Sequence, residues 1–431
     1  MINIFFIKDA KKYIGKEVTV KGWVFNKRSS GSIVFLQVRD GTGFIQATVL
    51  KNEVSVKVFE SVTNLTLETS VILIGIIREE ERAPSGCEIT VKDLKIISIA
   101  EDYPIGKKEH GPDFLLTHRH LWLRSKRQWA IQRIRNQLIN SINEYLQKES
   151  FIRIDTPIIT PSACEGTTTL FAIDYFGEKA YLSQSGQLYL EAAIYSFGRC
   201  YDFGPALRAE KSKTRRHLIE FWIMDAEAAF TNFDEILKIE EKFIYYILQR
   251  VLENCLGEFK IIERDIKPLK EIKIPFIRLR YEEAITKLQK LGSDISYGTD
   301  LGNDDETLLM NYFKQPVFIT HFPANIKAFY CKRDNTDDKL ALSADLLVPE
   351  GYGEIIGGGE REGSYEKLLT SIKSHGYKIK DYDWYLDLRK YGSVTHSGFG
   401  LGLERLVSWI CKLDHVRESI PFPRMLERFR P

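Results

Sequence analysis

The first 100 residues contain five short runs rich in β-branched and apolar side chains, and these runs limit the fold more than any other feature. In the first of them, Val18, Val20 and Val24 fall on one face at a period of two, which is typical of a half-buried strand. Turn sequences such as Asp40-Gly41-Thr42-Gly43 separate neighbouring runs. Five strands in so short a stretch predict a small barrel or sandwich, and the OB-type barrel is the five-stranded candidate. The runs are residues 17–25, 32–40, 43–50, 70–78 and 87–100.

Helices and strands are mixed in the rest of the chain. Residues 125–150 repeat apolar side chains at helical spacing, residues 217–230 are typical of a strand, and residues 231–256 predict a long helix. No regular alternation of strand and helix is present, so we expect an α+β fold with a largely antiparallel sheet flanked by helices. The predicted domains are a barrel at 1–102, a polar linker or hinge at 103–118, and a second domain at 119–431.

Composition excludes several classes of protein. With 44% hydrophobic and 28% charged residues, the chain is typical of a globular protein. Its six cysteines are scattered and form no C-x-x-C pair, so neither a zinc site nor a disulfide framework is predicted. The N-terminal sequence lacks the apolar core of a signal peptide, and the apolar run Val71–Ile77 is too short to cross a membrane. We therefore expect a cytoplasmic protein with no membrane partner.

The N-terminal 50 residues are locally basic, with eight Lys and Arg against three acids. This excess is compatible with a polyanionic partner. A solvated surface explains the same charges, so the charge pattern alone leaves both interpretations open.

A glycine-rich run, "THSGFGLGLERL", begins at Thr395 and leads into an apolar helix. It matches neither the P-loop nor the dinucleotide-binding pattern. The amide groups at a helix N-terminus attract anions, and Arg405 adds a permanent positive charge in the first turn. The run therefore predicts a phosphate site, with a packing turn beside a surface arginine as the alternative.

Two other segments place charges where a sheet is expected. In "FGPALRAEKSKTRRHLIEFWIMDAE", Arg208 and Glu210 alternate on one strand, and His217 and Asp225 follow on the returning strand. This pattern predicts a polar ligand on the sheet, or else a salt-bridged hairpin. In "SADLLVPEGYGEIIGGGERE", two acids stand in an apolar context and suit Mg²⁺ beside a phosphate site, or else are ordinary loop charges. These acids are Asp345 and Glu354.

Taken in this order, the segments resemble motifs 2 and 3 of the class II aminoacyl-tRNA synthetases. A long helix and a strand ending at Pro157 resemble the first motif. A barrel before the catalytic part is similar to the aspartate, asparagine and lysine subgroup. Within that subgroup, "SGQLYLE", "HFPANIKAFYCKRD" and "WYLDLRKYGSVTHSGFGLGLERL" resemble the asparaginyl enzymes. The resemblance covers essentially the whole chain.

The resemblance implies ATP as a substrate and Mg²⁺ as its companion ion. The amino-acid carboxylate itself would attack the nucleotide, so catalysis would rest on positioning and electrostatics. Arg208 would hold the α-phosphate and Arg405 the γ-phosphate. Glu210 would read the adenine amino group. The remaining members of this set are His217 near the terminal phosphates, and Asp345 and Glu354 on the metal.

The resemblance also implies a pocket for the amino acid. Leu190 stands where aspartyl relatives carry lysine, and the loss of that cation would favour a neutral amide. The alternative is that Leu190 only packs. Gly357 occupies a position where a serine can serve the metal, so that ligand would be absent or replaced by water. The implied pocket residues are Glu165, Ser185, Gln187, Asp225 and Arg361.

For the barrel, the resemblance implies that Arg28, Phe35 and Gln46 bind the central anticodon uridine, with Phe35 stacking on the base. Core packing is the alternative for Phe35. The first motif implies a homodimer with residues 126–149 and Pro157 near the interface. The expected function is the charging of tRNA(Asn) with asparagine.

Three other functions stay open from the sequence. The first is an aspartyl enzyme, including one that accepts both tRNAs. The second is a paralogue that makes asparagine from aspartate, against which the intact barrel argues. The third is a non-catalytic RNA-binding protein, which would have no need of the set Arg208, Glu210, Glu354 and Arg405.

Overall fold

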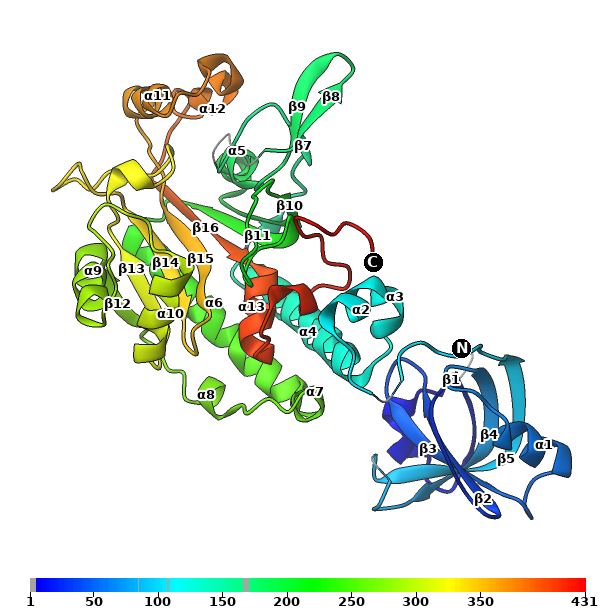
Figure 1. Ribbon diagram of the computed structural model, residues 1–431. Helices are drawn as coiled ribbons and strands as arrows, with labels where there is room; N and C mark the ends of the chain where they lie inside the picture. Colours follow the sequence, from blue (N-terminus) through cyan, green and yellow to red (C-terminus); the bar gives the residue numbers. More distant parts are fainter. Residues whose placement is uncertain (1–4, 84, 107, 166–169) are drawn as a thin grey trace. The chain divides into compact units, whose positions relative to one another are not determined.

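The computed structural model describes residues 5–83, 85–106, 108–165 and 170–431. The chain divides into two compact units, residues 1–111 and residues 112–431 (Figure 1). In the predicted hinge at 103–118, the described residues before Pro112 form no helix or strand, whereas Pro112–Thr117 form helix α2 and belong to the second unit.

The first unit is a closed five-stranded barrel with the strand order β1-β2-β3-β5-β4, which confirms the predicted barrel. Strands β3 and β5 pair in parallel, and the other neighbours pair in antiparallel. Val20, Leu36 and Ile89 are among the residues that fill the interior. The strands are β1 (Glu17–Ser30), β2 (Ile33–Arg39), β3 (Phe44–Leu50), β4 (Ser70–Glu79) and β5 (Cys87–Ser98), with helix α1 (Val56–Thr63) after β3.

The second unit is built on an eight-stranded sheet with the order β12-β13-β14-β15-β16-β11-β10-β6. The inner pairs from β13 to β10 are antiparallel, as predicted. The two edge pairs, β6 with β10 and β12 with β13, are parallel, so the sheet is mixed. The strands are β6 (Ile152–Arg153), β10 (Arg199–Leu207), β11 (Glu220–Ala229), β12 (Ile277–Arg280), β13 (Val317–Thr320), β14 (Ser343–Val348), β15 (Gly353–Glu360) and β16 (His396–Gly402).

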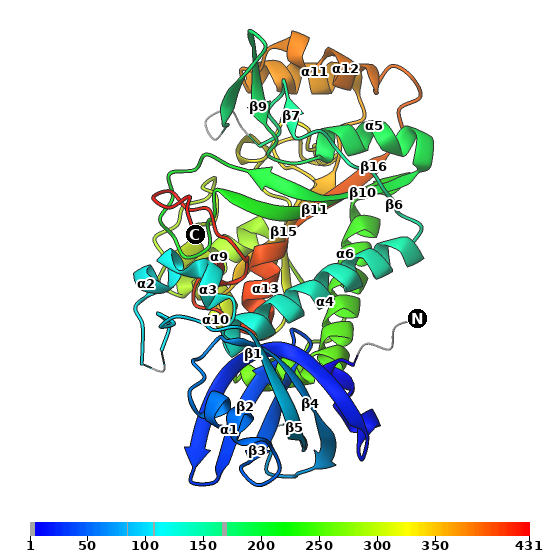
Figure 2. The same cartoon turned by 90° about the vertical axis from the view of Figure 1, so that its right-hand side faces the viewer.

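Helices cover one face of this sheet. Helices α4 (Lys126–Lys148) and α6 (Phe233–Asn254) pack side by side and share a buried core with α13 (Leu403–Cys411) and the sheet (Figure 2). The start of α6 is defined by a capping box between Asn232 and Glu235. On β11, Met224, Ala226 and Ala228 all point into this core. The period of two therefore turns Asp225 and Glu227 to the opposite face.

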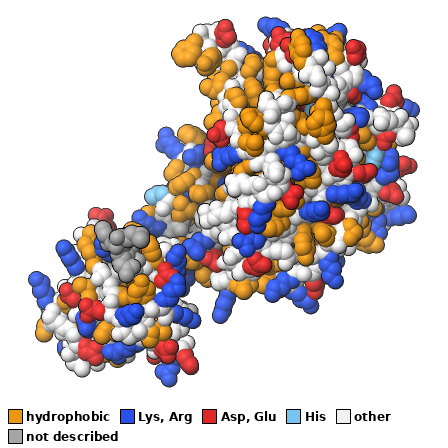
Figure 3. All heavy atoms as spheres, turned by 180° about the vertical axis from the view of Figure 1, so that it is seen from behind, with side chains coloured by type: hydrophobic (Ala, Val, Ile, Leu, Met, Phe, Trp, Pro, Cys, Tyr) orange, Lys and Arg blue, Asp and Glu red, His pale blue; other side chains and the backbone are white. Residues whose placement is uncertain are grey.

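Shorter elements complete the second unit. A three-stranded sheet of the order β7-β9-β8 lies outside the main sheet. On the face shown in Figure 3, basic and acidic side chains are interspersed. The remaining α-helices and strands are α3 (Arg119–Trp122), β7 (Ile159–Thr160), β8 (Ala172–Tyr175), β9 (Glu178–Leu182), α5 (Gln187–Phe197), α7 (Leu256–Ile261), α8 (Lys267–Lys270), α9 (Tyr281–Lys290), α10 (Asn303–Tyr312), α11 (Tyr365–Ser374) and α12 (Asp383–Asp387).

Three local predictions were wrong. The strand predicted to end at Pro157 ends at Arg153. Arg208 and Glu210 do not alternate on a strand, because β10 ends at Leu207, although the Arg208 amide still bonds to the Ile219 carbonyl. His217 precedes the returning strand, which begins at Glu220.

In the described part of the chain, every helix is too short or too polar to cross a membrane.

Candidate active site

The open face of the sheet carries a row of residues that are paired neighbours on successive strands. Asp225 on β11 pairs with Gly400 on β16, Gly400 pairs with Gly357 on β15, and Gly357 pairs with Asp345 on β14. The two carboxylates are therefore three strand spacings apart, or about 14 Å. Between them the floor consists only of glycine.

The glycines of this floor have a steric purpose. A Cβ atom at Gly400 would lie 2.6 Å from Asp225 Oδ1, and one at Gly398 would lie 2.0 Å from Glu227 Oε1. A side chain at either position would displace a buried carboxylate. The glycine-rich run thus forms the floor of the site and leads into α13, as predicted, with Arg405 in the first turn of the helix.

A cavity of about 500 Å³ lies above this floor. This volume is ordinary for a site that takes a small ligand or cofactor. Ten of the predicted residues line it: Glu165, Gln187, Arg208, Glu210, His217, Asp225, Asp345, Glu354, Arg361 and Arg405. The cavity therefore has one end at β11 and the other end at β14, β15 and α13.

At the second end, Arg405 faces Glu354. The Arg405 Nη1 donates to Glu354 Oε2 at 2.9 Å and to the Glu354 carbonyl at 3.1 Å. Burial alone would raise the pKa of Glu354, but Arg405 and Lys327 outweigh it and hold this pKa below its usual value. The guanidinium uses one nitrogen for this pair, and the side chain lines the cavity, where an anion can reach it.

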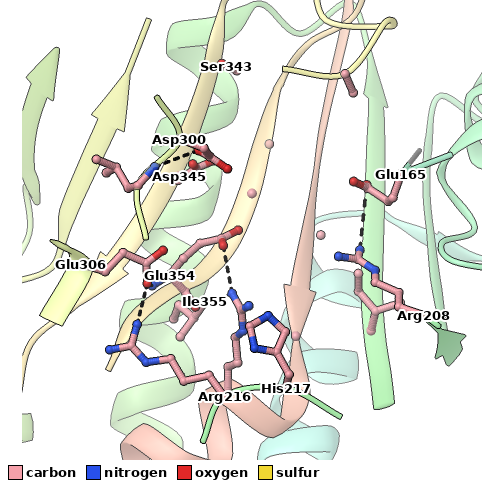
Figure 4. A pocket seen from close by; sticks show the side chains of 18 of the residues that line it. Glu165, Arg208, Arg216, His217, Asp300, Glu306, Ser343, Asp345, Glu354 and Ile355 are labelled. Atoms are coloured by element: carbon pink, nitrogen blue, oxygen red, sulfur yellow. Dashed lines mark hydrogen bonds and ion pairs between the residues drawn. The ribbon is translucent and has the colours of Figure 1, made fainter. Parts of the chain in front are cut away.

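Arg216 lies nearby but is engaged with protein groups. Its guanidinium donates to Glu306 at 2.7 Å and to the Gly351 carbonyl at 2.5 Å, and so anchors the segment after β10 to α10 and the β14–β15 turn (Figure 4). Burial raises the pKa of the Glu306 carboxyl, and Glu354 raises it further. Arg216 therefore has a positioning role, which the sequence interpretation missed.

Arg208 lines the cavity and lies close to Glu165. Its guanidinium lies 5.4 Å from the centre of the Phe221 ring, and its Nη2 is 4.0 Å from Glu165 Oε1 (Figure 4). The Arg208 Nε is buried without a hydrogen-bond partner among the described residues. A buried, unpaired guanidinium N–H is costly unless a ligand accepts from it. Phe221 adds a flat apolar surface that the sequence interpretation also missed.

Glu210 and His217 face each other, with His217 Nε2 3.5 Å from Glu210 Oε2. Burial lowers the pKa of His217, and the positive charge of Arg405 lowers it further. The other ring nitrogen of His217 lies against the hydroxyls of Ser212 and Thr214. The pair thus offers the cavity one carboxylate and a largely neutral imidazole.

Asp345 and Glu354 fit a magnesium ion that arrives with phosphate oxygens. They project from neighbouring strands into the same space (Figure 4). A Cβ at Gly357 would lie 3.1 Å from Glu354 Oε1 and 3.7 Å from Asp345 Oδ1, so glycine leaves open the space around both oxygens. Across the described ranges, no cluster of three or more His, Cys, Asp or Glu side chains could hold a metal. Two carboxylates with substrate oxygens are a donor set that suits Mg²⁺.

At the first end, Asp225 is largely buried but lines the cavity. Its Oδ2 accepts from Ser185 Oγ at 2.6 Å and from the Gly186 amide at 2.9 Å. Burial raises the pKa of Asp225 to about 6, against the lowering effect of these two hydrogen bonds. Ser185 thus lies behind Asp225 and orients it, and it is not among the residues that line the cavity. Asp225 offers a carboxylate suited to an ammonium group.

Glu227 forms a buried ion pair with Arg361 beside Asp225. The Arg361 Nη2 is 2.5 Å from Glu227 Oε1, and both side chains are almost completely buried. Burial raises the pKa of Glu227 although Arg361 opposes this change. The sequence interpretation named Arg361 and missed Glu227. The signal was present, because Glu227 follows Asp225 by two residues on the same strand face.

A second buried network supports this end of the cavity. Gln187 lines the cavity, and its Nε2 donates to Glu191 Oε1 at 3.2 Å. Glu191 also accepts from Arg389 Nη2 at 2.7 Å and contacts His396 Nε2 at 2.9 Å. Burial alone would raise the pKa of Glu191, but the positive charge of Arg389 and the hydrogen bond from His396 hold this pKa below its usual range. The oxygen of the Gln187 amide is thereby directed away from Glu191.

The barrel carries a separate polar surface. Phe35 is half-buried on the outer side of β2 and lies outside the barrel core. The Arg28 guanidinium lies 5.0 Å from the centre of the Phe35 ring, on the neighbouring strand. Gln46 Nε2 donates to Glu88 Oε2 at 2.9 Å. The three predicted residues therefore lie on three adjacent strands, and core packing of Phe35 is excluded.

Comparison with known proteins assigns both units. Residues 111–426 match the family model of tRNA synthetases class II (D, K and N), and residues 18–97 match the OB-fold nucleic acid binding domain. The chain is a class II aminoacyl-tRNA synthetase. It is 53% identical over 425 residues to the asparagine–tRNA ligase of Desulforamulus reducens, with 99% of each chain covered.

Two further relatives of this synthetase extend the comparison. The asparagine–tRNA ligase of Koribacter versatilis is 50% identical over 434 residues, covering 99% of this chain and 98% of the relative. The asparaginyl-tRNA synthetase of Pyrococcus horikoshii, solved as a complex with asparaginyl-adenylate, has a TM-score of 0.96 and 45% identity over the full length of both chains.

Leu190 lies apart from the synthetase cavity. It is completely buried in a small apolar cluster with Ile194 and Cys200, one turn of α5 beyond Gln187. The residue does not line the cavity. If it affects specificity, it does so because it brings no cation to this buried position, and that role stays a prediction.

Proposed function

We propose that this synthetase activates asparagine with ATP and transfers the asparaginyl group to tRNA(Asn). The observation that carries the proposal is the buried Glu227–Arg361 ion pair beside Asp225. Relatives named asparagine–tRNA ligase at 50% and 53% identity over nearly the full chain support the same assignment.

The charge balance of the pair favours a carboxamide over a carboxylate. Arg361 lines the cavity and can donate to the side-chain oxygen of asparagine, and Glu227, which is paired with Arg361 but is not itself among the lining residues, would accept from the amide nitrogen once asparagine is bound. An aspartate side chain would bring a second negative charge to Glu227 in a buried space, which is strongly unfavourable. Shape alone could not separate two side chains of nearly equal size.

The reaction would proceed in two displacements. In the first, the asparagine carboxylate oxygen attacks the α-phosphorus of ATP, and pyrophosphate leaves. In the second, a hydroxyl of the terminal tRNA ribose attacks the carbonyl carbon of the adenylate, and AMP leaves. Asp225 would hold the α-ammonium, with Gln187 beside it. Arg208 would stabilise the charge that develops on the α-phosphate.

The other end of the cavity would position the rest of the nucleotide. Arg405 and His217 would lie near the terminal phosphates, and Glu210 would accept from the adenine amino group, with Phe221 as a stacking surface. Asp345 and Glu354 would hold Mg²⁺, which when bound neutralises phosphate charge. No side chain would have to act as a nucleophile, so catalysis is positioning and electrostatics.

The barrel would bind the anticodon, with Phe35 stacking on a base and Arg28 and Gln46 beside it. Changing Phe35 to Ala is expected to lower the rate of tRNA charging about tenfold or more, and to leave asparagine-dependent ATP–pyrophosphate exchange unchanged. An equal loss in both assays would show that the residue acts through the fold. The enzyme would act in the cytoplasm, where tRNA is used in translation.

A homodimer is the proposed assembly. Ile152, Phe197 and Phe230 are large apolar side chains that are 46%, 52% and 79% exposed. They lie near one another, since Ile152 pairs with Cys200 and the amide of Ala229 bonds to Gly198. These side chains form an apolar surface beside α4 and the segment up to Pro157. Such a surface supports a homodimer in which it is buried against a second copy of the chain. Sedimentation of the purified chain tests this assembly.

The deciding experiment is ATP–pyrophosphate exchange with asparagine and aspartate tested separately in Mg²⁺. Exchange with asparagine, followed by asparaginylation of tRNA(Asn), is the expected result. Comparable exchange with aspartate would favour the aspartyl alternative. Exchange with neither amino acid would overturn the adenylation mechanism.

A further inference from the structure

Lys327 occupies the acidic corner of the cavity, and none of the roles above uses it. Its Nζ lies 2.6 Å from Asp345 Oδ2 and 3.7 Å from the centre of the Phe322 ring. The side chain is only 17% exposed and lines the cavity. A lysine so strongly buried between a carboxylate and an aromatic face has a defined position rather than a solvated one.

The two carboxylates assigned to the metal are held in the same way. One oxygen of Asp345 is taken by Lys327, and one oxygen of Glu354 is taken by Arg405. The free oxygens, Asp345 Oδ1 and Glu354 Oε1, both lie within 3.7 Å of the point where a Cβ of Gly357 would stand. The cations thus leave one oxygen of each carboxylate directed to a common space.

Three ion pairs offset most of the negative charge of this corner before any ligand binds, and Asp300, which also lines the cavity and acts on Lys327, adds one further carboxylate. Lys327 pairs with Asp345, Arg405 with Glu354, and Arg216 with Glu306. A divalent cation entering the free enzyme would meet the Lys327 ammonium group within a few ångströms of the free carboxylate oxygens, and this charge would oppose its binding. The triphosphate of ATP would add negative charge and further oxygen ligands for the metal.

We propose that Lys327 is a positioning residue that makes divalent-metal binding conditional on ATP. Its ammonium group orients Asp345 with one oxygen free and repels a metal ion that arrives alone, so the metal enters together with the triphosphate. The inference rests on the proposed function of the site and adds an order of binding to it.

The test is the binding of Mn²⁺ to the ATP-free protein, measured by electron paramagnetic resonance. Lys327→Met and Lys327→Gln remove the charge, and we expect Mn²⁺ to bind about tenfold or more tightly to both than to the wild type, because a unit charge a few ångströms away is lost. Adding Asp345→Asn to Lys327→Met should abolish the gain. Circular dichroism establishes that each variant is folded.

Lys332→Met is the matched control. Lys332 Nζ lies 2.5 Å from Glu360 Oε1 in a comparably buried ion pair, but neither residue lines the cavity. Its Mn²⁺ affinity should equal that of the wild type. A gain in this control would show that any lost lysine charge raises the affinity, and would overturn the assignment to Lys327.

Unchanged or weaker Mn²⁺ binding in both Lys327 variants would also overturn the proposal. If those variants instead lost affinity for ATP in the presence of a chelator, Lys327 would be a direct phosphate ligand. None of these measurements requires amino acid, tRNA or turnover. A failure of asparagine-dependent exchange would therefore leave the metal result interpretable, and the two failures can be told apart.

Discussion

The two ends of the cavity both contain carboxylates paired with basic side chains, but the pairs are arranged differently. At the β14–β15 end, Arg405 and Lys327 each hold one oxygen of a carboxylate and leave the other oxygen toward the cavity. At the β11 end, Glu227 and Arg361 pair with each other in complete burial. The β14–β15 end is arranged for a highly charged ligand that brings its own cation. The Glu227–Arg361 pair at the β11 end is already neutral and suits an uncharged side chain. Ion pairs therefore contribute to affinity at one end of the cavity and to specificity at the other.

The largest effect should follow from a change between the two ends, at Arg208. Replacing Arg208 with Ala removes a cation whose Nε has no protein acceptor among the described residues, and should lower the exchange rate constant about 10²- to 10³-fold. The thermal midpoint should change little. Stopped assays of exchange measure the loss, and Arg133→Ala, which removes an exposed arginine paired with Glu258, is the control. A loss below tenfold would contradict the role.

Breaking the neutral pair at the β11 end should change specificity. Glu227→Gln leaves Arg361 without its partner, so an aspartate carboxylate can pair with it while the amide of asparagine loses an acceptor. We expect the asparagine-to-aspartate ratio of kcat/KM to fall about 100-fold. Exchange assays with both amino acids measure the ratio. An unchanged ratio would remove this pair from the account of specificity.

A substitution in the glycine floor should have a smaller effect than the changes at Arg208 and Glu227. Gly400→Ala places a Cβ 2.6 Å from Asp225 Oδ1, and the resulting shift should raise the KM for asparagine about tenfold. The KM for ATP should change less. The control is Gly257→Ala, since nothing lies within 4 Å of a Cβ at that position. Equal increases in both KM values would mean that the whole floor moves.

The smallest expected effect is a pH dependence confined to the β11 end. Asp225 has a pKa raised by burial to about 6, and it attracts an ammonium group only when deprotonated. Asparagine binding without ATP should therefore weaken severalfold as the pH falls from 7 to 5. Calorimetry at several pH values measures this change. The Glu227→Gln variant removes the second titrating carboxyl group at this end. In this variant, the midpoint of the pH dependence of asparagine binding should lie near 6. If binding does not change with pH in this variant, Asp225 is not the group that controls it.

Sequence patterns predicted the structure correctly where it depends on residues that are close together in the chain. The period-two runs predicted the barrel strands, and the glycine-rich run predicted that α13 begins with Arg405 in its first turn. They failed where a strand ends early, as at Leu207, because a strand boundary depends on its partner. Glu227 was within reach of the same period-two reasoning, whereas Lys327 lay within the quoted segment "HFPANIKAFYCKRD" but its pairing with Asp345 had no local signal.

By itself, the sequence determined the two-part architecture, the family motifs and most of the side chains that meet in the cavity. Only the tertiary structure decided which carboxylate oxygens of Asp345 and Glu354 are held by a cation and which face the cavity. The row from Asp225 through Gly400 and Gly357 to Asp345 depends on the register of strands far apart in the chain. A period of two assigns a side chain to a face but not to a neighbour across the sheet, because register comes from non-local pairing and packing. For the same reason the partners of Arg361 and Asp345 emerge only when the sheet is assembled.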